Sequence, residues 1–594
     1  MAPLHLTDFE KLTINNLITR KIFQYLSLKD QFRLAQVTFE FKCLYRNIIW
    51  NVDYEKLIII KCPQDFLVQN ESNINMLALT AAELEEFINL YGCDIKELNL
   101  QYLSKYELCP NELVEIGVDI KEIYEKRHFT LSLRKMPNLM SLSYNNMILT
   151  KSDIQSIVRD CKSLQKLSIY NCFNGKCDVL VLGRDLKIWT LLEIKHLKYL
   201  YMGSSMLLEL SYQDFHELIT KSKIKKLFLK YKIEKENVNI LEDQCKVNDL
   251  EELEIGTNLT EGKWSLYFQT FKNLQLLTLQ DIGIIKIDFL NLLANTCKKL
   301  KILSINYTTF EKVDNFHQLN SLEELNIQIC QGLTHQNLRQ ILTEMNLQKF
   351  TSLWTKYEGE FEDFIICSKI QFLEIEILKT PDFKGAYEAN HNLRSLIWHD
   401  DYGPPRQMLT FNCPHLKELE IESGFIALEN LLQLNSLHCL TLRNAPANFP
   451  WSYLIEILKN HISLKEFTIK HLNYYHLDLK LTPTEAFKCA ANIECIKIPT
   501  RIFEVAIDFW FDLLNRNPKV KLICLDWFSK ELLHNLINNP KFPGFLRFIY
   551  IQGFKVVCKE LRNNFDQTLE KIHFNKHKRL SVNNSNYGLI FNGI

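Results

Sequence analysis

The chain repeats one short pattern of apolar positions, Leu-x-x-Leu-x-Leu, with Ile, Val or Phe at some of them. The pattern is present at Ile95–Leu100 and recurs from Leu139 to Leu569, with successive first positions about 25 residues apart. A period of ~20 to 29 residues is typical of chains built from stacked structural repeats. The alternation inside the pattern predicts a short strand whose Leu side chains share one face.

The segments between these strands carry a helical pattern. At Thr150 and at Thr334, a threonine is followed by apolar residues four, seven and eight positions later. This spacing defines one face of a helix, and Thr150 with Asp153 has the sequence of a capping box. Because a strand-helix unit of this length cannot bury its own apolar face, neighbouring units must stack. We therefore predict an α/β fold over residues 139–580, a solenoid shaped as a horseshoe with parallel strands on its concave face and helices on its convex face.

Two regions beside this array are less regular. Residues 53–138 are interpreted as an entry region with divergent first repeats, including a strand near Leu57–Ile60. The interval from Gln101 to Asn138 contains either one further divergent repeat or a loop insertion. Residues 581–594 are rich in Asn, fit no strand-helix unit, and are assigned as a C-terminal tail.

The cysteines follow the repeat. Cys161, Cys297 and Cys413 each lie three residues before a repeat leucine, and Cys172 and Cys330 lie eight residues after one. This placement resembles the cysteine-containing class of leucine-rich repeats. We expect buried, reduced thiols that pack as small apolar groups, and no metal or redox role.

Charge and motif content exclude several classes of function. The 70 Lys and Arg residues balance 70 Asp and Glu residues, so we expect no nucleic-acid partner. No run of ~18 apolar residues occurs, and residues 1–11 contain Asp8 and Glu10 without an apolar run, so we expect a soluble protein that is neither secreted nor bound to a membrane. Phosphate-loop, dinucleotide, nucleophile-elbow and zinc-protease motifs are absent from the sequence, so we expect no enzyme activity and no cofactor. The 17 cysteines, without Cys-x-x-Cys pairs, favour a cytoplasmic or nuclear location.

Residues 8–52 have a different organisation. Their apolar spacing predicts three short helices within about forty residues, a size at which a domain seldom stands alone. Such a bundle has more apolar surface than it can bury, so we expect it to be completed by another protein.

This segment resembles the F-box. The resemblance rests on Ile22-Phe23, on Tyr25-Leu26-Ser27-Leu28 with Asp30, and on the closing Trp50, which stand in family order. Thr13 occupies the place where the family usually has proline. F-boxes bind the small adaptor of cullin-RING (SCF) ubiquitin ligases, and the resemblance implies the adaptor-binding residues Leu12, Leu17, Ile18, Ile22, Phe23, Leu26, Leu28, Leu34, Val37 and Trp50.

An F-box followed by leucine-rich repeats resembles the substrate receptors of these ligases. The resemblance therefore implies a non-catalytic recognition subunit that binds the adaptor and cullin through the F-box and a protein target through the repeats. The alternative is a leucine-rich-repeat scaffold or regulator outside any ligase. In that case the N-terminal helices cap the array or bind another partner.

On each predicted strand, the x positions face the concavity, so they are read as the target-binding surface. Tyr201, Phe228 and Tyr550 are aromatic candidates for binding anchors. Acidic x positions gather in the middle repeats and basic ones in the late repeats. We select Glu254, Glu374, Glu420 and Lys497 as candidates for charged contacts. An ordinary solvated face of mixed charge is the alternative.

Overall fold

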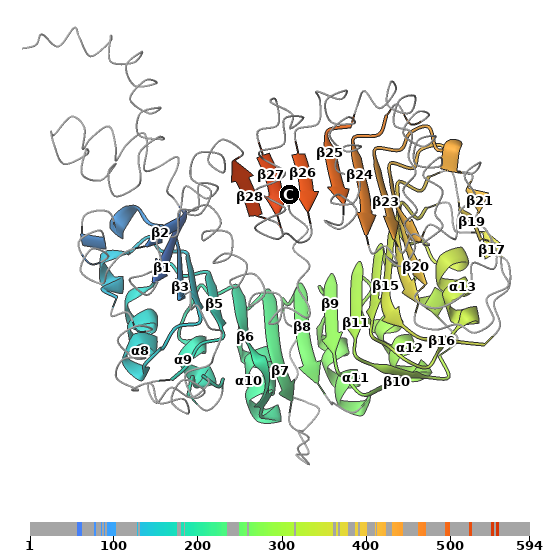
Figure 1. The fold of residues 1–594 in the computed structure, drawn as a ribbon. Helices are drawn as coiled ribbons and strands as arrows, with labels where there is room; N and C mark the ends of the chain where they lie inside the picture. The colour runs from blue at the N-terminus through green and yellow to red at the C-terminus, as the bar shows by residue number, and fades with distance from the viewer. Residues whose placement is uncertain are drawn as a thin grey trace, which may run out of the picture. The chain divides into compact units, whose positions relative to one another are not determined.

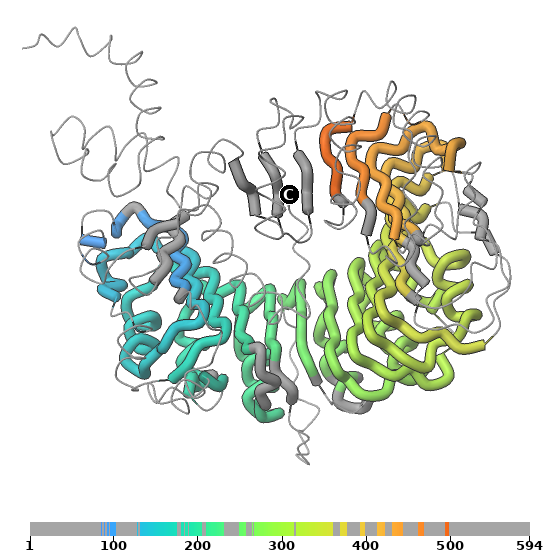
Figure 2. The backbone as a smooth tube through the Cα atoms, in the orientation of Figure 1, coloured from blue at the N-terminus to red at the C-terminus, as the bar shows by residue number. Residues whose placement is uncertain are grey.

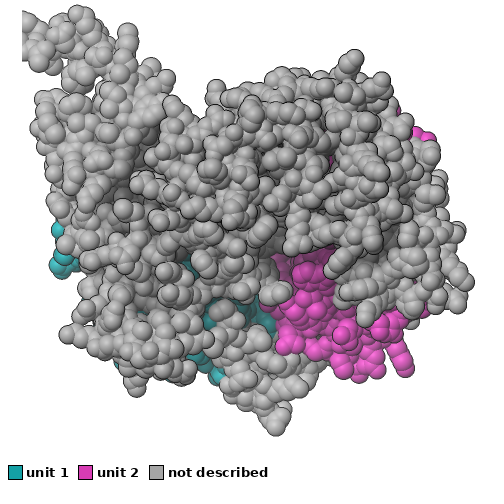
Figure 3. Space-filling view, viewed as in Figure 1, with its two compact units in different colours: residues 1–258 teal, residues 259–594 magenta. Residues whose placement is uncertain are grey.

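A computed structural model describes the chain in two compact units, residues 1–258 and 259–594, which Figure 3 colours separately. The structure describes most of 131–233, 249–257 and 261–359. It also describes 92–102, 369–377, 392–400, 413–422, 431–443, 463–470 and 493–498, together with the backbone of several further strands and a few single residues. Residues 1–55 and 558–594 lie outside the described part, so the F-box prediction and the tail are not assessed by it.

Unit 1 is built on one parallel sheet. Its strands pair side by side in the order β2 (Met76–Ala78), β1 (Lys56–Lys61), β3 (Glu97–Tyr102), β4 (Ser141–Asn145), β5 (Lys166–Tyr170), β6 (Tyr199–Leu210), β7 (Lys226–Ile233) and β8 (Glu252–Thr257) (Figure 1). The strand predicted near Leu57–Ile60 is confirmed as β1. Because β3 pairs directly with β4, no strand from the interval between them enters the sheet there. Residues 103–127 lie outside the described part, so both interpretations of the interval stay predictions.

Unit 2 continues the same arrangement along the chain. Its parallel strands pair in sequence order as β9 (Leu276–Gln280), β11 (Ile302–Asn306), β13 (Glu324–Gln328), β15 (Lys349–Thr355), β18 (Phe372–Ile377), β20 (Ser395–Asp400), β22 (Glu418–Glu422), β23 (Cys439–Arg443), β24 (Glu466–Lys470), β25 (Cys495–Ile498), β26 (Leu522–Leu525) and β27 (Phe548–Ile551). A final strand, β28 (Phe554–Val557), pairs with β27 in the antiparallel sense.

The repeat leucines form the core in both units. Leu303 of β11, for example, stands directly between Leu277 of β9 and Leu325 of β13, and all three are fully buried. Every first position of the pattern from Leu139 to Ile493 is at most 5% exposed. The predicted inward face and the solenoid class are thus confirmed, because in-register stacking of identical positions is what buries a unit that cannot bury itself.

Helices cover one face of each sheet (Figures 1 and 2). Within the described residues, these are α8 (Lys151–Asp160), α9 (Ile188–Leu192) and α10 (Tyr212–Lys221) in unit 1, and α11 (Glu261–Thr270), α12 (Ile287–Thr296) and α13 (His335–Glu344) in unit 2. The opposite face, which we call the open face, carries the x positions of the strands.

The predicted helix starts at Thr150 and Thr334 are confirmed. Each threonine caps its helix reciprocally with the third residue of the first turn, Asp153 in α8 and Asn337 in α13. Asp153 also accepts a hydrogen bond from His128 Nε2 at 3.0 Å. Burial opposes ionisation of Asp153, but the hydrogen bonds from His128 and Thr150 outweigh it and lower its pKa.

The expectation of a helix in each connection is wrong for part of unit 2. Between β15 and β22, the described parts of the connections contain short strands instead, β17 (Phe364–Ile365), β19 (Tyr387–Ala389) and β21 (Thr410–Phe411), which pair with each other. Here paired positions such as Lys349, Phe372 and Ser395 are only 23 residues apart. An extended chain covers more distance per residue than a helix, so a connection of this length can cross the layer as a strand.

Several strands end in a residue with left-handed backbone geometry. Asn146, Asn171 and Asp281 hold this position after β4, β5 and β9, with φ between 48° and 56°. Asn and Asp tolerate this conformation. After β11 and β13, however, the position is held by Tyr307 and Ile329, with φ of 55° and 52°. The backbone N–H of Tyr307 donates to Gln328 O at 3.0 Å, so the hydrogen bonds of the repeat hold the turn in place.

No helix in the described part of the chain combines the length and the apolar character that crossing a membrane requires.

Candidate functional site

The open face of unit 1 is set by the register of its strands. Ser168, Tyr201, Phe228 and Glu254 stand in one column across β5, β6, β7 and β8. Lys166, Tyr199, Lys226 and Glu252 form the neighbouring column. Alternate residues of these strands are buried leucines or isoleucines, so both columns point away from the core.

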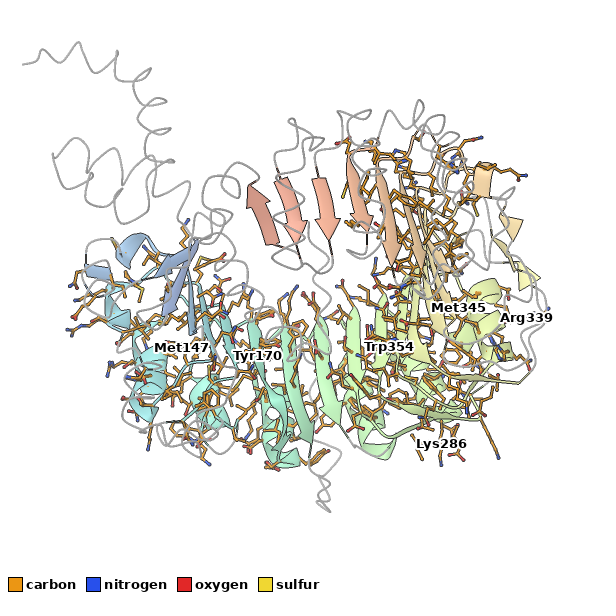
Figure 4. All side chains as sticks on the ribbon, viewed as in Figure 1. Met147, Tyr170, Lys286, Arg339, Met345 and Trp354 are labelled. Atoms are coloured by element: carbon orange, nitrogen blue, oxygen red, sulfur yellow. The ribbon has the colours of Figure 1, made fainter. Side chains whose placement is uncertain are left out.

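An aromatic cluster occupies the centre of this face. The Tyr170 and Tyr201 rings lie 5.8 Å apart between centroids, Tyr199 and Phe228 lie 5.3 Å apart, and Tyr201 and Phe228 lie 6.4 Å apart. All four residues are half-buried. Figure 4 labels Tyr170 on strand β5. Tilted rings at these distances attract one another, so the cluster is a pre-arranged surface of low conformational entropy.

Charged groups border the cluster. Lys166 Nζ lies 4.6 Å from the centroid of the Tyr199 ring, and Lys230 Nζ lies 5.7 Å from that of Tyr170. Lys226 forms an ion pair with Glu252 at 2.5 Å. Burial, with Tyr170 and Glu254 nearby, raises the pKa of Tyr201. The phenol therefore stays protonated at neutral pH and keeps a hydroxyl group able to donate a hydrogen bond to a ligand.

The open face of unit 2 carries an ion-pair cluster. Arg443 of β23 lies 3.3 Å from Glu420 of β22 and 4.0 Å from Glu376 of β18. All three side chains are at most 25% exposed. Farther along the sheet, Lys497 pairs with Glu466. Cations on neighbouring strands thus partly neutralise the acidic side chains of the middle repeats. The charge of this face is closer to the mixed-charge alternative than to a uniformly acidic surface.

The selected target-binding residues fall on the open face in the predicted register. Tyr201, Phe228 and Glu254 are brought together on three adjacent strands of unit 1. Glu374 and Glu420 share one column of unit 2 with Ile397 between them, and Lys497 lies farther along the same column. Tyr550 lies on β27 in this column by its backbone, and its side chain is outside the described part. Their role in binding stays a prediction.

Sequence reasoning missed Tyr170, Tyr199 and Arg443 as members of these surfaces. All three stand at x positions of their strands, so counting the open-face positions could have included the two tyrosines. The pairing of Arg443 with Glu376 had no signal in the sequence. The two residues are separated by 67 positions along the chain and meet only because the repeats stack.

The described cysteines at the repeat positions are buried, as their placement predicts. Cys161, Cys172, Cys330 and Cys413 are buried, and burial raises the pKa of each to about 12. A thiol with so high a pKa has almost no thiolate at neutral pH and is a poor nucleophile. Within the described residues, no group of three or more His, Cys, Asp or Glu side chains is arranged to hold a metal ion.

An internalin (inlF) from Listeria monocytogenes str. 4b F2365 is similar at 14% sequence identity and a TM-score of 0.29, over 66% of this chain and 94% of that chain. No family model matches the chain, and no curated protein matches it. The assignment to the leucine-rich-repeat architecture rests on the strand register and burial described above.

Proposed function

We propose that this chain is the substrate-recognition subunit of an SCF-type E3 ubiquitin ligase. In this proposal, residues 8–52 bind the adaptor and through it the cullin, and the open face of the repeats binds the protein target. The observation that carries the proposal is an F-box-like segment placed directly before a solenoid with a pre-arranged aromatic surface.

The physical contribution of such a subunit is positioning. A stiff repeat array that holds a target near a separately recruited, ubiquitin-carrying enzyme raises the effective concentration of the target lysine without any chemistry of its own. The aromatic cluster suits the binding step, because buried aromatic side chains dominate the energetics of protein interfaces. A cytoplasmic or nuclear location belongs to the same proposal.

Co-purification of the full chain with the SCF adaptor and cullin tests the ligase part. We expect both to be recovered with the wild-type chain and lost with L17D/I22D/L26D, which places charges on the apolar face of the first predicted helix. The matched control is N16D/R20Q, on the opposite side of that helix by its spacing. Absence of adaptor and cullin from the wild-type preparation would contradict the proposal and favour the non-ligase scaffold.

Proximity labelling with and without proteasome inhibition tests target binding. Proteins that accumulate next to the wild-type chain under inhibition are expected to be lost with Y199S/Y201S/F228S. The control is Y307S, which removes an exposed aromatic ring from unit 2 while leaving the aromatic cluster of unit 1 intact. An unchanged set of labelled proteins in the triple variant would show that targets bind elsewhere.

A further inference from the structure

A second surface lies in unit 2, at the edge where the strands begin. Residues that directly precede the strands from β15 to β24 line a groove of about 1060 Å³ there, which we call the basic groove. From Asn346 to His438, each repeat contributes the two residues that flank a buried leucine or isoleucine. Asn392 and Arg394 flank Leu393, for example, and His415 and Lys417 flank Leu416. Because neighbours of an inward residue point outward, the repeat itself generates this lining.

The basic groove has an unusual charge. Its lining includes Lys369, Arg394, His415, Lys417 and His438, and the other described residues of the lining are Asn, Gln or Ser. In a chain with equal numbers of acidic and basic residues, the described part of this lining thus contains no carboxylate. Lys369 Nζ donates to Asn346 Oδ1 at 2.8 Å, whereas Arg394 and Lys417 form no ion pair with any described residue and are exposed.

The groove has defined ends. The residue that precedes each strand is hydrogen-bonded through its backbone to the equivalent residue of the next repeat: Arg394 N–H donates to Gln371 O at 2.8 Å, and Lys417 N–H donates to Arg394 O at 2.8 Å. This row runs from Gln348 to Lys465 without an acidic residue, and the next residues in the row on either side are Glu323 and Glu494. Glu323 is paired with Lys301 at 2.7 Å. The unpaired positive charge is therefore confined to a stretch of six strands.

The dimensions fit an extended peptide. Parallel strands lie ~4.8 Å apart, so six neighbouring positions span roughly 24 Å, which an extended chain of about eight residues covers. Acidic side chains on one side of that chain recur every ~6.7 Å, within reach of flexible Lys and Arg side chains from neighbouring strands. The Asn and Gln side chains both donate and accept hydrogen bonds and can pair with a peptide backbone.

Other anionic ligands fit less well. No Phe, Tyr or Trp is among the described residues that line the groove, whereas single-stranded nucleic acid is bound largely by stacking of its bases on such rings. A small anion needs convergent donors at one point, whereas Arg394, Lys417 and Lys369 are spread over three strands.

We infer that the basic groove binds an extended acidic segment of a partner protein, with Arg394 and Lys417 as its principal cations. The inference deepens the proposed function, on which it rests for the identity of the partner as the ligase target. The aromatic cluster of unit 1 and the basic groove of unit 2 then recognise separate features of that target.

Fluorescence anisotropy with the full chain tests the inference. The probe is a labelled ten-residue peptide of alternating Glu and Ser, compared with the same peptide carrying Gln for Glu. We expect the acidic peptide to bind about tenfold or more tightly than the neutral one, with affinity that falls as salt rises. R394E/K417E is expected to lower this affinity about tenfold or more.

The control variant, K272E/K298E, makes the same charge change in unit 2 outside the groove and is expected to bind as wild type. Thermal melting of each variant checks that the fold is retained. Equal binding of the two peptides, or unchanged affinity in R394E/K417E, would overturn the inference. Tighter binding of a single-stranded oligouridine, or full displacement of the peptide by millimolar phosphate, would also overturn it by identifying another ligand.

The adaptor experiment separates this inference from the proposed function. If adaptor and cullin are recovered but the peptide does not bind, the ligase proposal stands and the inference about the groove is wrong. If the peptide binds but neither adaptor nor cullin is recovered, the inference about the groove stands and the ligase proposal is wrong.

Discussion

Asn337 supports unit 2 through a set of buried hydrogen bonds, and its removal gives a sharp test of the repeat architecture. Its Oδ1 accepts from the Thr334 backbone N–H at 2.8 Å and from the Thr334 hydroxyl at 2.9 Å. Its Nδ2 donates to Val313 O at 2.5 Å, which connects α13 to the preceding repeat. The side chain is 2% exposed, so water cannot replace these partners.

The expected cost of Asn337→Ala follows from these contacts. Losing the hydrogen bonds costs about 0.5 to 1.5 kcal/mol each, and leaving the Val313 carbonyl buried without a donor adds about 1 to 3 kcal/mol. The better helix propensity of alanine offsets roughly 0.5 kcal/mol. We therefore expect a net local destabilisation of about 3 kcal/mol, which corresponds to an increase of roughly 100-fold in the opening equilibrium of this region.

Hydrogen exchange measured by mass spectrometry is the suitable assay, because a repeat array opens locally and each repeat depends mainly on its neighbours. Peptides that span 309–344 are expected to exchange about 100-fold faster in Asn337→Ala, and peptides of unit 1 are expected to be unaffected. Gln336→Ala, at an exposed position of the same helix turn, is the matched control with an expected change below ~0.5 kcal/mol. Exchange within threefold of wild type in Asn337→Ala would refute the reasoning.

Asn337→Asp gives a second signature. At pH 7 a carboxylate would face the Val313 carbonyl oxygen, whereas a protonated carboxyl group can donate to it. The penalty of this variant should therefore shrink as the pH falls. A penalty that is the same at pH 7 and pH 5 would show that the contact with Val313 does not matter.

Three further outcomes follow from the structure. Burial lowers the pKa of His335 to about 4, so between pH ~6.5 and 4 the unfolded chain binds a proton that the native state does not. The free energy of unfolding should therefore decrease by up to about 3 kcal/mol as the pH is lowered from ~6.5 to 4. Urea melts of H335Q at pH 7 and 5 should lack this decrease. Iodoacetamide at pH 8 should leave the buried thiols of the native chain unmodified for hours but label them rapidly in urea, and rapid native labelling would contradict the raised pKa of Cys161, Cys172, Cys330 and Cys413. Tyr307→Asn should stabilise the chain by about 1 kcal/mol in thermal melting, because asparagine tolerates a φ of 55° better than tyrosine, and a lower melting temperature would show that the ring contributes more than the strain costs.

The sequence alone determined the repeat, its inward positions, and two helix starts. The leucines from Leu139 to Leu464 are buried where the pattern places them, and Thr150 and Thr334 cap their helices. These features are local or periodic. A strand of five residues with alternating apolar positions has one way to bury them, and a threonine before a helical pattern has its capping partner three residues away.

The identity of neighbouring side chains depends on how the repeats stack in the folded chain. Tyr170 meets Tyr201, Arg443 meets Glu376, and β3 pairs with β4 across the 38-residue interval between them, because strand register joins residues from different repeats. The basic groove arises in the same way. Arg394 and Lys417 are 23 residues apart in sequence, and the backbone hydrogen bonds between successive repeats place them side by side. A one-residue change of register would turn such residues toward the core, so their assembly into a surface depends on the stacking of the whole unit.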